Sequence, residues 1–599
     1  MMSSFTKFAI IAVVAVAGVV VVSGHLSGAA DAQKLPGSDV IPADRLTDWT
    51  PGVTVGVPGG IPTDRNNLID VTKAPYNADN TGTADAQPAI MKAVTAAKDK
   101  DVVYLPAGTY RINQTIYTGA KSNITIRGDG PDKTLILPYG NTGGILVGGA
   151  WDWLWQKPDW AIAGSPKKGD TVITVGDTSA LDKYPNGGIG RICRIILKND
   201  PKLPVVAMGS WDYCRRQKSR IVAKTPTSVT IDPPLLFDLP VDLAPKMAVA
   251  TQQAEFVGVE DLKFDAKNST SGGGFVYMKQ CYGCWAKNVT VLNVPNRHLW
   301  ISDSLQCQFE HCFVSKRIGQ GSNGAGILMA STSFSLFQDN IVAYQFAHIQ
   351  MESGSSGNVV AYNYCYDSSI GGMIGVSINA DHSPHNSFNL YEGNVSSKFQ
   401  CDGYHGSTSH DTVFRNWLHG TNDKTDQFGI CVYLNRFTRA YSVVGNVLGS
   451  PKYTYLYDND NNGFGYNQHF IYVFGLPNMG NGGFNGKTVQ LSKGIDWPDM
   501  PALRAAEPGK GPRDGFQELD LDVKATTLLK GNWNYCDKGV RASESLKGVK
   551  LPSSLYLKEK PAWFGNLNWP AFGPDTDFEK NKIPAQLRYE EMMKKGTTQ

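Results

Sequence analysis

The chain contains a repeated segment in which a short apolar stretch ends in Asn and is followed by another apolar residue. The clearest copies are Val359-Val-Ala-Tyr-Asn363-Tyr, Leu390-Tyr-Glu-Gly-Asn394-Val, Val413-Phe-Arg-Asn416-Trp and Val443-Val-Gly-Asn446-Val. Successive Asn markers lie 22 to 31 residues apart, and repeats of this length are typical of solenoids. The copies are rich in β-branched and aromatic residues and are bounded by Gly, Asn, Ser and Asp, which favours strands over helices.

The repeat extends in both directions from these copies. Equivalent markers are Asp261, Asn288, Cys312 and Asn340 on the N-terminal side and Asn532 on the C-terminal side. The spacing suits a coil of three short strands, so the sequence predicts an all-β solenoid. Asn tolerates left-handed backbone angles at a bend, and its amide can hydrogen-bond the equivalent amides of neighbouring coils. We therefore expect an asparagine ladder; the alternative is that these residues mark ordinary turns.

A second group of motifs precedes the repeat. It comprises Asn77-Ala-Asp-Asn-Thr-Gly82, Ala89-Ile-Met-Lys-Ala93-Val94, Val102-Val-Tyr-Leu-Pro-Ala-Gly-Thr-Tyr-Arg-Ile112 and Asn123-Ile-Thr-Ile-Arg-Gly128-Asp-Gly130. This group resembles the opening segment of the pectate-lyase-like superfamily, which rhamnogalacturonase, epimerase-like and tailspike proteins share. The resemblance implies a right-handed parallel β-helix with a helix that covers its first coil. Independently, residues 88–98 place Ile90, Ala93, Val94 and Ala97 on one helical face, as a capping helix requires.

The termini and two irregular regions complete the predicted organisation. Residues 1–32 combine a basic start, an apolar run from Phe8 to Val22 and the small-residue motif Ala30-Asp31-Ala32, which predicts a signal peptide and a secreted, periplasmic or cell-surface protein. The alternative is an uncleaved N-terminal anchor. We expect an N-terminal extension at 33–65, the β-helix at 66–535 with insertions at about 151–245 and 459–522, and an irregular C-terminal tail at 536–599.

Composition limits the partners and cofactors. The net charge is only +3 and no basic run is visible, which argues against nucleic acid as a partner. Cys281-Tyr-Gly-Cys284 is half of a zinc pattern without a second pair, so no metal site is expected there. The stretch from Asp458 to Gly463 matches the start of a calcium loop but has His469 where the closing Glu belongs, which favours an ordinary turn. We therefore expect no cofactor, with calcium as the alternative.

Candidate site residues lie on the strand that precedes each Asn-marked strand. Because side chains alternate between faces, each of these strands presents its polar residues outward when its apolar residues face the core. The predicted catalytic residues are Glu352, Asp381, Asp402 and His405, and the predicted substrate-binding residues are Trp300, His348, Asn379, Tyr404, Tyr433, Asn435, Arg436 and Arg439. Any one of these polar residues could instead be satisfied by its own turn.

A strip of aromatic rings, carboxylates, histidines and amides across parallel coils suits a polysaccharide, because rings stack on sugars and polar groups bind hydroxyls. Carboxylates on successive coils could act as general acid and base in glycoside hydrolysis. Alternatively, a base and a cation, with Arg415, Arg436, Arg439 or His405 as candidates, could support β-elimination on a polymer that contains uronate. A third hypothesis is a carbohydrate-binding or adhesive surface protein without catalysis.

Overall fold

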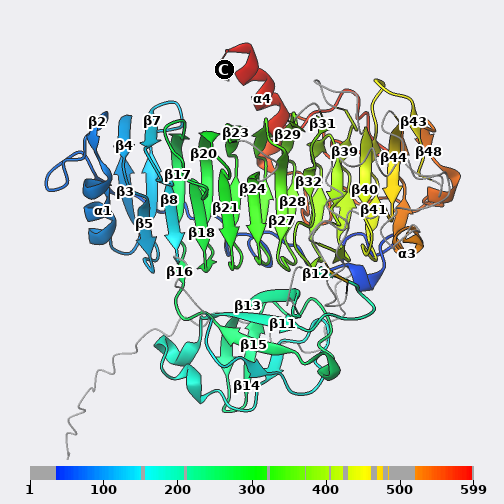
Figure 1. The fold of residues 1–599 in the computed structure, drawn as a ribbon, viewed down its shortest axis with the longest axis horizontal. Helices are drawn as coiled ribbons and strands as arrows, with labels where there is room; N and C mark the ends of the chain where they lie inside the picture. Colours follow the sequence, from blue (N-terminus) through cyan, green and yellow to red (C-terminus); the bar gives the residue numbers. More distant parts are fainter. Residues whose placement is uncertain are drawn as a thin grey trace, which may run out of the picture.

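The computed structural model of this chain describes residues 35–149, 155–207, 212–319, 324–370, 373–403, 406–421, 429–459, 468–476, 483–484 and 520–596. Parallel strands wind through these residues into one elongated solenoid, seen side-on in Figure 1. Most coils contribute one strand to an 11-stranded sheet and one or two to a 23-stranded sheet. The predicted fold class, a parallel β-helix, is therefore confirmed.

The 11-stranded sheet forms one side of the solenoid and carries most of the predicted site residues. Its strands, in spatial order, are β5 (Ile116–Gly119), β8 (Ile145–Gly148), β18 (Val276–Lys279), β21 (Leu299–Ser302), β24 (Ala325–Ala330), β27 (Ala347–Glu352), β32 (Ser377–Asn379), β36 (Phe399–Cys401), β40 (Ile430–Leu434), β44 (His469–Phe474) and β43 (Tyr455–Leu456).

The 23-stranded sheet bends to form the other two sides. The first run comprises β1 (Asn67–Asp70), β3 (Asp101–Leu105), β6 (Thr125–Gly128), β17 (Gly258–Asp265), β20 (Trp285–Val294), β22 (Gln308–Glu310), β25 (Leu336–Gln338), β28 (Val359–Ala361), β34 (Leu390–Glu392), β38 (Thr412–Phe414), β41 (Ser442–Val444) and β46 (Leu528–Lys530). The long strands β17 and β20 also continue into the second run, which contains β2 (Thr81–Asp85), β4 (Gly108–Ile112), β7 (Thr134–Pro138), β23 (Phe313–Arg317), β26 (Ile341–Ala343), β29 (Tyr364–Tyr366), β35 (Val395–Ser396), β39 (Trp417–Leu418), β42 (Val447–Leu448), β47 (Trp533–Asn534) and β48 (Gly539–Val540).

The asparagine ladder is confirmed from Asn340 to Asn532. The side-chain amide of each ladder residue donates to the side-chain oxygen of the next at 2.9–3.0 Å, through Asn340, Asn363, Asn394, Asn416, Asn446 and Asn532. A second buried ladder that the sequence analysis missed links Asn358, Asn389 and Asp411. Because these amides are buried, each hydrogen bond satisfies groups that water cannot reach.

The prediction was wrong by one residue for the first two markers. Asp261 and Asn288 have φ values of +56° and +52° and occupy the left-handed position that precedes the ladder. The ladder position itself is taken by Leu262 and Val289, which pair with each other in the sheet. Left-handed bends favour Asp and Asn as strongly as a ladder favours Asn, so the same residue types mark both positions.

The ends of the solenoid and the interior follow the predicted pattern of burial. Helix α1 (Gln87–Ala96) buries Ile90, Ala93 and Val94 in the same cluster as the first coils and so caps the N-terminal end. Helix α3 (Leu521–Thr526) precedes the last coil. In the part of the chain that the structure describes, no helix is both long and apolar enough to cross a membrane. The predicted signal peptide lies outside the described residues.

Between β8 and β16 (Ala254–Glu255) the chain leaves the solenoid and forms an antiparallel six-stranded sheet beside it (Figure 1). Its strands are β9 (Trp160–Ala161), β10 (Val172–Thr174), β11 (Ile192–Leu197), β13 (Arg215–Lys224), β14 (Ser228–Asp232) and β15 (Lys246–Val249). Ile173 and Ile195 of this inserted sheet share one apolar cluster with Leu305 and Phe334 of the solenoid. The inserted sheet is therefore packed against the coils.

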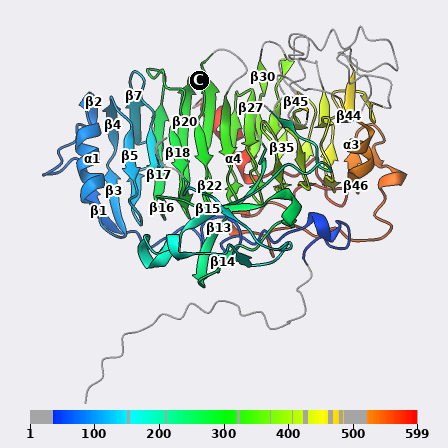
Figure 2. The same cartoon turned by 60° about the horizontal axis from the view of Figure 1, so that its bottom comes forward.

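The two ends of the described chain run along the outside of the solenoid (Figure 2). Residues 35–60, which we call the N-terminal arm, begin beside the late coils: Arg45 donates to the carbonyl of Tyr441 at 2.7 Å and Trp49 to that of Phe388 at 3.1 Å. The C-terminal tail also follows the coils and is held by an Arg415–Asp575 ion pair of 2.7 Å. The tail is less irregular than predicted, because it ends in helix α4 (Pro584–Lys594).

Candidate functional site

The candidate site lies on the outer face of the 11-stranded sheet. Register pairing places Gln350 of β27 beside Asn379 of β32, Asn379 beside Gln400 of β36, and Gln400 beside Tyr433 of β40. The residues between them, such as Ile378 and Phe399, belong to the interior cluster. Side-chain alternation therefore directs this polar row away from the core, as the sequence predicts.

A second row, two residues further along each strand, brings the predicted carboxylates together. Backbone pairing continues past the end of β32. The backbone amide of Ala380 donates to the backbone carbonyl of Gln400 at 2.8 Å, and the backbone amide of His382 donates to the carbonyl of Met351 at 2.9 Å. Glu352, Asp381 and Asp402 consequently stand on three successive coils. Adjacent parallel strands are about 4.8 Å apart, so each of these residues lies one strand spacing from the next.

Asp402 is the hydrogen-bonded centre of this group. Its Oδ2 accepts from the Asn379 amide at 2.6 Å and from the ring nitrogen Nδ1 of His382 at 2.8 Å. Burial lowers the pKa of His382, but the charge and hydrogen bond of Asp402, with the charge of Glu352, outweigh it and raise the pKa to about 9. At neutral pH His382 is therefore a cation paired with Asp402. The sequence analysis did not select His382.

Asp381 differs from its neighbours because no described residue forms an ion pair or hydrogen bond with its carboxyl group. Its side chain is 1% exposed, and neither carboxyl oxygen has a hydrogen-bond partner within the described part of the chain. Burial raises its pKa well above the usual range for Asp, and the charges of Asp402 and Asp411 raise it further. Burial and the neighbouring charges therefore both favour the protonated form of Asp381 beside the Asp402–His382 pair.

Buried amides without hydrogen-bond partners among the described residues lie on the same three strands as Asp381 and Asp402, or directly follow them. Both side-chain polar atoms of Gln400 and of Asn435 are unpartnered in the described structure, as is Oδ1 of Asn379. Most buried polar groups in proteins are hydrogen-bonded, and each exception needs an explanation such as a bound ligand or water. Three neighbouring strands thus direct unused donors and acceptors toward one face of the same sheet.

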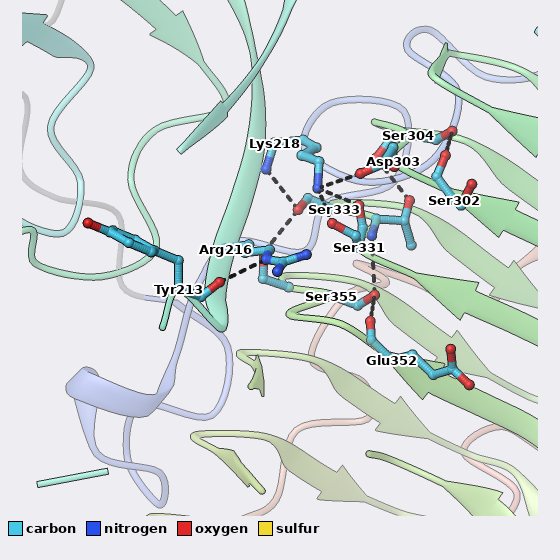
Figure 3. Close-up of polar contacts among 12 residues, drawn as sticks. Tyr213, Arg216, Lys218, Ser302, Asp303, Ser304, Ser331, Ser333, Glu352 and Ser355 are labelled. Carbon is cyan, nitrogen blue, oxygen red and sulfur yellow. Dashed lines mark hydrogen bonds and ion pairs between the residues drawn. The ribbon is translucent and has the colours of Figure 1, made fainter. Parts of the chain in front are cut away.

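Glu352 borders this cluster on the side of the early coils. Its Oε1 accepts from the amide of Gln350 at 2.6 Å, and the side chain is partly exposed. Figure 3 shows how the turn behind it is fixed: Ser355 donates to the carbonyl of Glu352 at 2.8 Å, while the carboxyl group points away from the serines. Lys218 of the inserted sheet donates to the Ser331 carbonyl at 2.6 Å, one coil away (Figure 3).

An aromatic pair lies on the same face toward the N-terminal coils. The rings of Tyr277 and Trp300 stack with centroids 4.2 Å apart and planes 12° apart. The guanidinium of Arg297 lies 4.8 Å from the centroid of Trp300. The predicted residue Trp300 is therefore part of a partly exposed platform that also contains Tyr277 and Arg297, which the sequence analysis did not name.

Three predicted substrate-binding residues are not available to a ligand. The pairing of β27 with β32 skips a residue between Ala347 and Ile349, so alternation fails at His348. His348 is buried, is bonded to the Ser377 hydroxyl and the Tyr366 carbonyl at 2.9 Å each, and has its pKa lowered to about 4 by burial.

Tyr433 and Arg439 were also predicted to contact substrate, and the structure assigns them other contacts. Tyr433 points outward but is fully buried in an apolar cluster with Ile430 and Phe470. Arg439 forms an ion pair with Asp520 at 2.9 Å, which fastens the segment before α3. Arg436 is largely buried beside Phe437, and Tyr404 and His405 lie outside the described residues.

Among the described residues, no group of three or more His, Cys, Asp or Glu side chains has the arrangement of a metal site. Asp458, the first residue of the calcium-like stretch, forms an ion pair with Lys524 at 2.8 Å. Most of that stretch lies outside the described residues, so calcium stays an alternative.

Comparison with known proteins gives one family match over a short segment and several solved structures with a similar fold. Residues 70–147 match the family described as rhamnogalacturonase A/epimerase, pectate lyase-like. A comparison with curated protein sequences finds no match. Among solved structures, the chain is similar to the tailspike of Pseudomonas phage phi297, with 12% identity over 69% of this chain and 81% of that chain and a TM-score of 0.45.

Two further solved structures have the same low level of similarity. The A-module of a mannuronan C-5 epimerase from Azotobacter vinelandii shares 13% identity over 67% of this chain and 91% of that chain, with a TM-score of 0.35. A surface adhesin of Streptococcus pneumoniae shares 12% identity over 64% and 88%, with a TM-score of 0.32.

Proposed function

We propose that this member of the pectate-lyase-like superfamily hydrolyses glycosidic bonds of a polysaccharide at the cluster of Glu352, Asp381 and Asp402. The observation that carries the proposal is Asp381, a buried carboxyl with no hydrogen-bond partner among the described residues and with a raised pKa, beside an Asp402 that contacts His382 at 2.8 Å. Two carboxyl groups whose environments separate their protonation states are the arrangement that acid–base catalysis at neutral pH requires.

In this mechanism Asp381 is the general acid. It donates its proton to the glycosidic oxygen as the bond to the leaving sugar breaks. Asp402 is held in place by Asn379 and His382 and acts as the carboxylate that attacks the anomeric carbon, which forms a glycosyl ester. Asp381, now ionised, then takes a proton from a water that attacks the same carbon, which releases the sugar and restores both carboxyl groups. The spacing of about 4.8 Å between adjacent coils matches the roughly 5–5.5 Å carboxyl separation of retaining glycosidases, so we expect the product to retain the anomeric configuration.

The remaining groups of the face position the sugar chain. The amides of Gln400 and Asn435 are buried and unpartnered in the described structure, and we assign their unused hydrogen-bonding capacity to hydroxyl groups next to the scissile bond. The Tyr277–Trp300 platform offers an aromatic surface for a sugar further along the chain. Export by the predicted signal at residues 1–32 accords with an extracellular polymer as substrate.

A second candidate reaction is β-elimination on a uronate. It is favoured by Arg297, which has no carboxylate partner among the described residues. The positive charge of Arg297 lowers the pKa of His382, so the two side chains are close enough to interact. A cation at that place would neutralise the carboxylate of an acidic sugar and stabilise the charge that develops when the neighbouring proton is removed.

The products distinguish these reactions. The protein is incubated with a panel of neutral and acidic polysaccharides, and both reducing ends and the ultraviolet absorbance of unsaturated sugars are measured. Reducing ends without that absorbance support hydrolysis, and proton NMR of the first anomer formed tests retention. Unsaturated products would contradict hydrolysis and support β-elimination. Binding without any product, at every pH tested, would contradict both and leave a non-catalytic adhesin.

A further inference from the structure

A second groove lies on a different side of the solenoid from the carboxylate cluster. It is a cavity of 360 Å³ at the bend between the two runs of the 23-stranded sheet, and we call it the bend groove. It is lined by Asp261, Lys287, Asn288, Glu310, His311, Asp339 and Trp563. None of these residues belongs to the 11-stranded sheet, so the bend groove is separate from the candidate active site.

The floor of the bend groove repeats from coil to coil. Asp261, Asn288, His311 and Asp339 all have φ near +55° and occupy the left-handed position of four successive coils. Because adjacent coils are about 4.8 Å apart, this row extends over roughly 14 Å. That length accommodates a short linear chain rather than a single small molecule.

Hydrogen bonds within the row fix some polar atoms and leave others unused. Asn288 donates its amide to Asp261 at 2.7 Å, and Nδ1 of His311 lies 3.0 Å from Asp339. The Asn288 oxygen and the second ring nitrogen of His311 have no partner in the described part of the protein, and the His311 side chain is 41% exposed. The row is therefore preorganised, with hydrogen-bonding capacity left for a ligand.

A charged pair borders the row. Oε2 of Glu310 accepts from the amides of Gln308 and Gln338 at 2.6 and 3.0 Å, which orients the carboxylate. Oε1 has only a loose contact of 3.8 Å with Lys287, whose side chain is 46% exposed. Both groups can turn to a ligand at little cost, because an exposed pair at this distance contributes little stability.

Trp563 of the C-terminal tail forms the wall. Its ring packs edge-on against Tyr362 with centroids 5.5 Å apart, and the next residue, Phe564, is buried. The indole is thereby fixed beside the polar row while it stays partly exposed. A rigid aromatic surface beside hydroxyl-binding groups is the combination that sugar rings require.

The lining also excludes other ligand classes. It contains no aliphatic side chain, so it does not suit a lipid or an apolar helix. Arg588 neutralises Asp339 through contacts of 2.8 and 3.0 Å, which leaves Asp261 and Glu310 against Lys287 alone. This slightly negative balance disfavours anionic ligands such as nucleic acid or a uronate polymer.

We propose that the bend groove is a second, non-catalytic binding site for a neutral oligosaccharide, with Trp563 as its stacking surface. It does not depend on the proposed hydrolysis, because it uses neither the residues nor the face of the carboxylate cluster. A site of this kind would hold the protein on its polymer while the other face acts.

The test uses the full chain with Asp381→Asn, so that no bound glycan is consumed, on a printed array of neutral oligosaccharides. Trp563→Ala should weaken binding of at least one glycan by roughly twofold to tenfold, the loss expected for one stacking contact. Glu310→Gln should weaken the same glycan, whereas Glu559→Gln, an exposed tail residue outside the groove, should leave it unchanged.

Trp300→Ala separates the two sites, because it alters only the face of the carboxylate cluster. Array binding that is lost with Trp563→Ala and Glu310→Gln but kept with Trp300→Ala supports the bend groove. Absence of array binding, or binding that depends on Trp300 and not on Trp563 or Glu310, overturns it. Thermal unfolding of the Glu310→Gln protein checks that any loss of binding is not a loss of fold.

Discussion

At the scale of single residues, Asp402 sets the protonation of both of its neighbours. Burial and the charge of Asp402 both raise the pKa of Asp381, and the charge and hydrogen bond of Asp402 outweigh burial to raise the pKa of His382 to about 9. Burial acts in opposite directions on the two, since it favours the neutral form of each. The acid and the cation of the site therefore depend on one carboxylate.

Replacing Asp381 with Asn tests the general acid. Activity should fall about 10²- to 10⁴-fold, the usual contribution of general acid–base catalysis. Because the raised pKa makes the folded state bind more protons, the wild type loses stability as pH rises above the unfolded-state pKa of about 3.9. The variant lacks that loss, so its thermal midpoint should exceed that of the wild type at pH 8 and not at pH 4. Retained activity would exclude Asp381 as the acid.

The His382–Asp402 pair should produce the opposite pH dependence of stability. A folded-state pKa of about 9 against 6.5 unfolded stabilises the protein fully below pH 6.5, and this contribution disappears as pH rises through 9. His382→Gln should therefore cost about 1–3 kcal/mol at pH 6 and little at pH 10. Denaturant unfolding at the two pH values measures it; an equal cost at both would show that the pair is not charged.

Much of the site could be predicted because strand alternation depends only on the chain. It placed Glu352, Asp381, Asp402, Asn379 and Asn435 on one face. It could not identify His382, which follows Asp381 directly and by alternation would point the other way, but lies beyond the end of β32. His348 was predicted on the wrong face because the register of β27 against β32 shifts between Ala347 and Ile349, which breaks the alternation of side chains inside this strand.

At the scale of elements, each bend of the solenoid uses two consecutive positions with different demands. The first needs a left-handed backbone, and the second is buried and favours an amide that bonds to the coils on both sides. Asn satisfies both, so the sequence alone did not distinguish Asn288 in the first position from Asn340 in the second. Burial, which depends on the assembled coils, makes the distinction.

The two positions should respond differently to mutation. Asn394→Ala removes a fully buried ladder residue. The amides of Asn363 and the carbonyl oxygen of Val360 then lose their hydrogen-bond partner, which should lower the free energy of unfolding by about 2–4 kcal/mol. Asn288→Gly keeps the left-handed bend at a partly exposed position and should cost less than about 1 kcal/mol. Chemical denaturation of both variants provides the comparison, and equal losses would contradict the assignment of the two positions.

At the scale of the whole molecule, the solenoid is held along its length by segments outside the repeat. The N-terminal arm contacts late coils through Arg45 and Trp49 and earlier ones through Val57, whose amide donates to Gln308 at 3.3 Å. Such contacts link coils that do not touch one another, so they make the unfolding of a quasi-one-dimensional structure more cooperative. The repeat pattern contains no signal for where such a segment packs.

Trp49→Ala should therefore destabilise the protein by about 3–5 kcal/mol, as expected for a buried indole, although Trp49 lies outside the β-helix. Val53→Ala is the matched control, because Val53 belongs to the same arm and is 66% exposed. Its effect should be within about 0.5 kcal/mol. Thermal unfolding compares the two, and similar small shifts would mean that the arm does not hold the coils.

The position of the N-terminal arm also orders events during biosynthesis. The ribosome makes the arm first, yet the backbone groups that bind Arg45 and Trp49 are added 396 and 339 residues later. Coils can stack one by one as they emerge, because each needs only its predecessor. The arm must therefore wait, and its docking follows the formation of the coils that contain Phe388 and Tyr441.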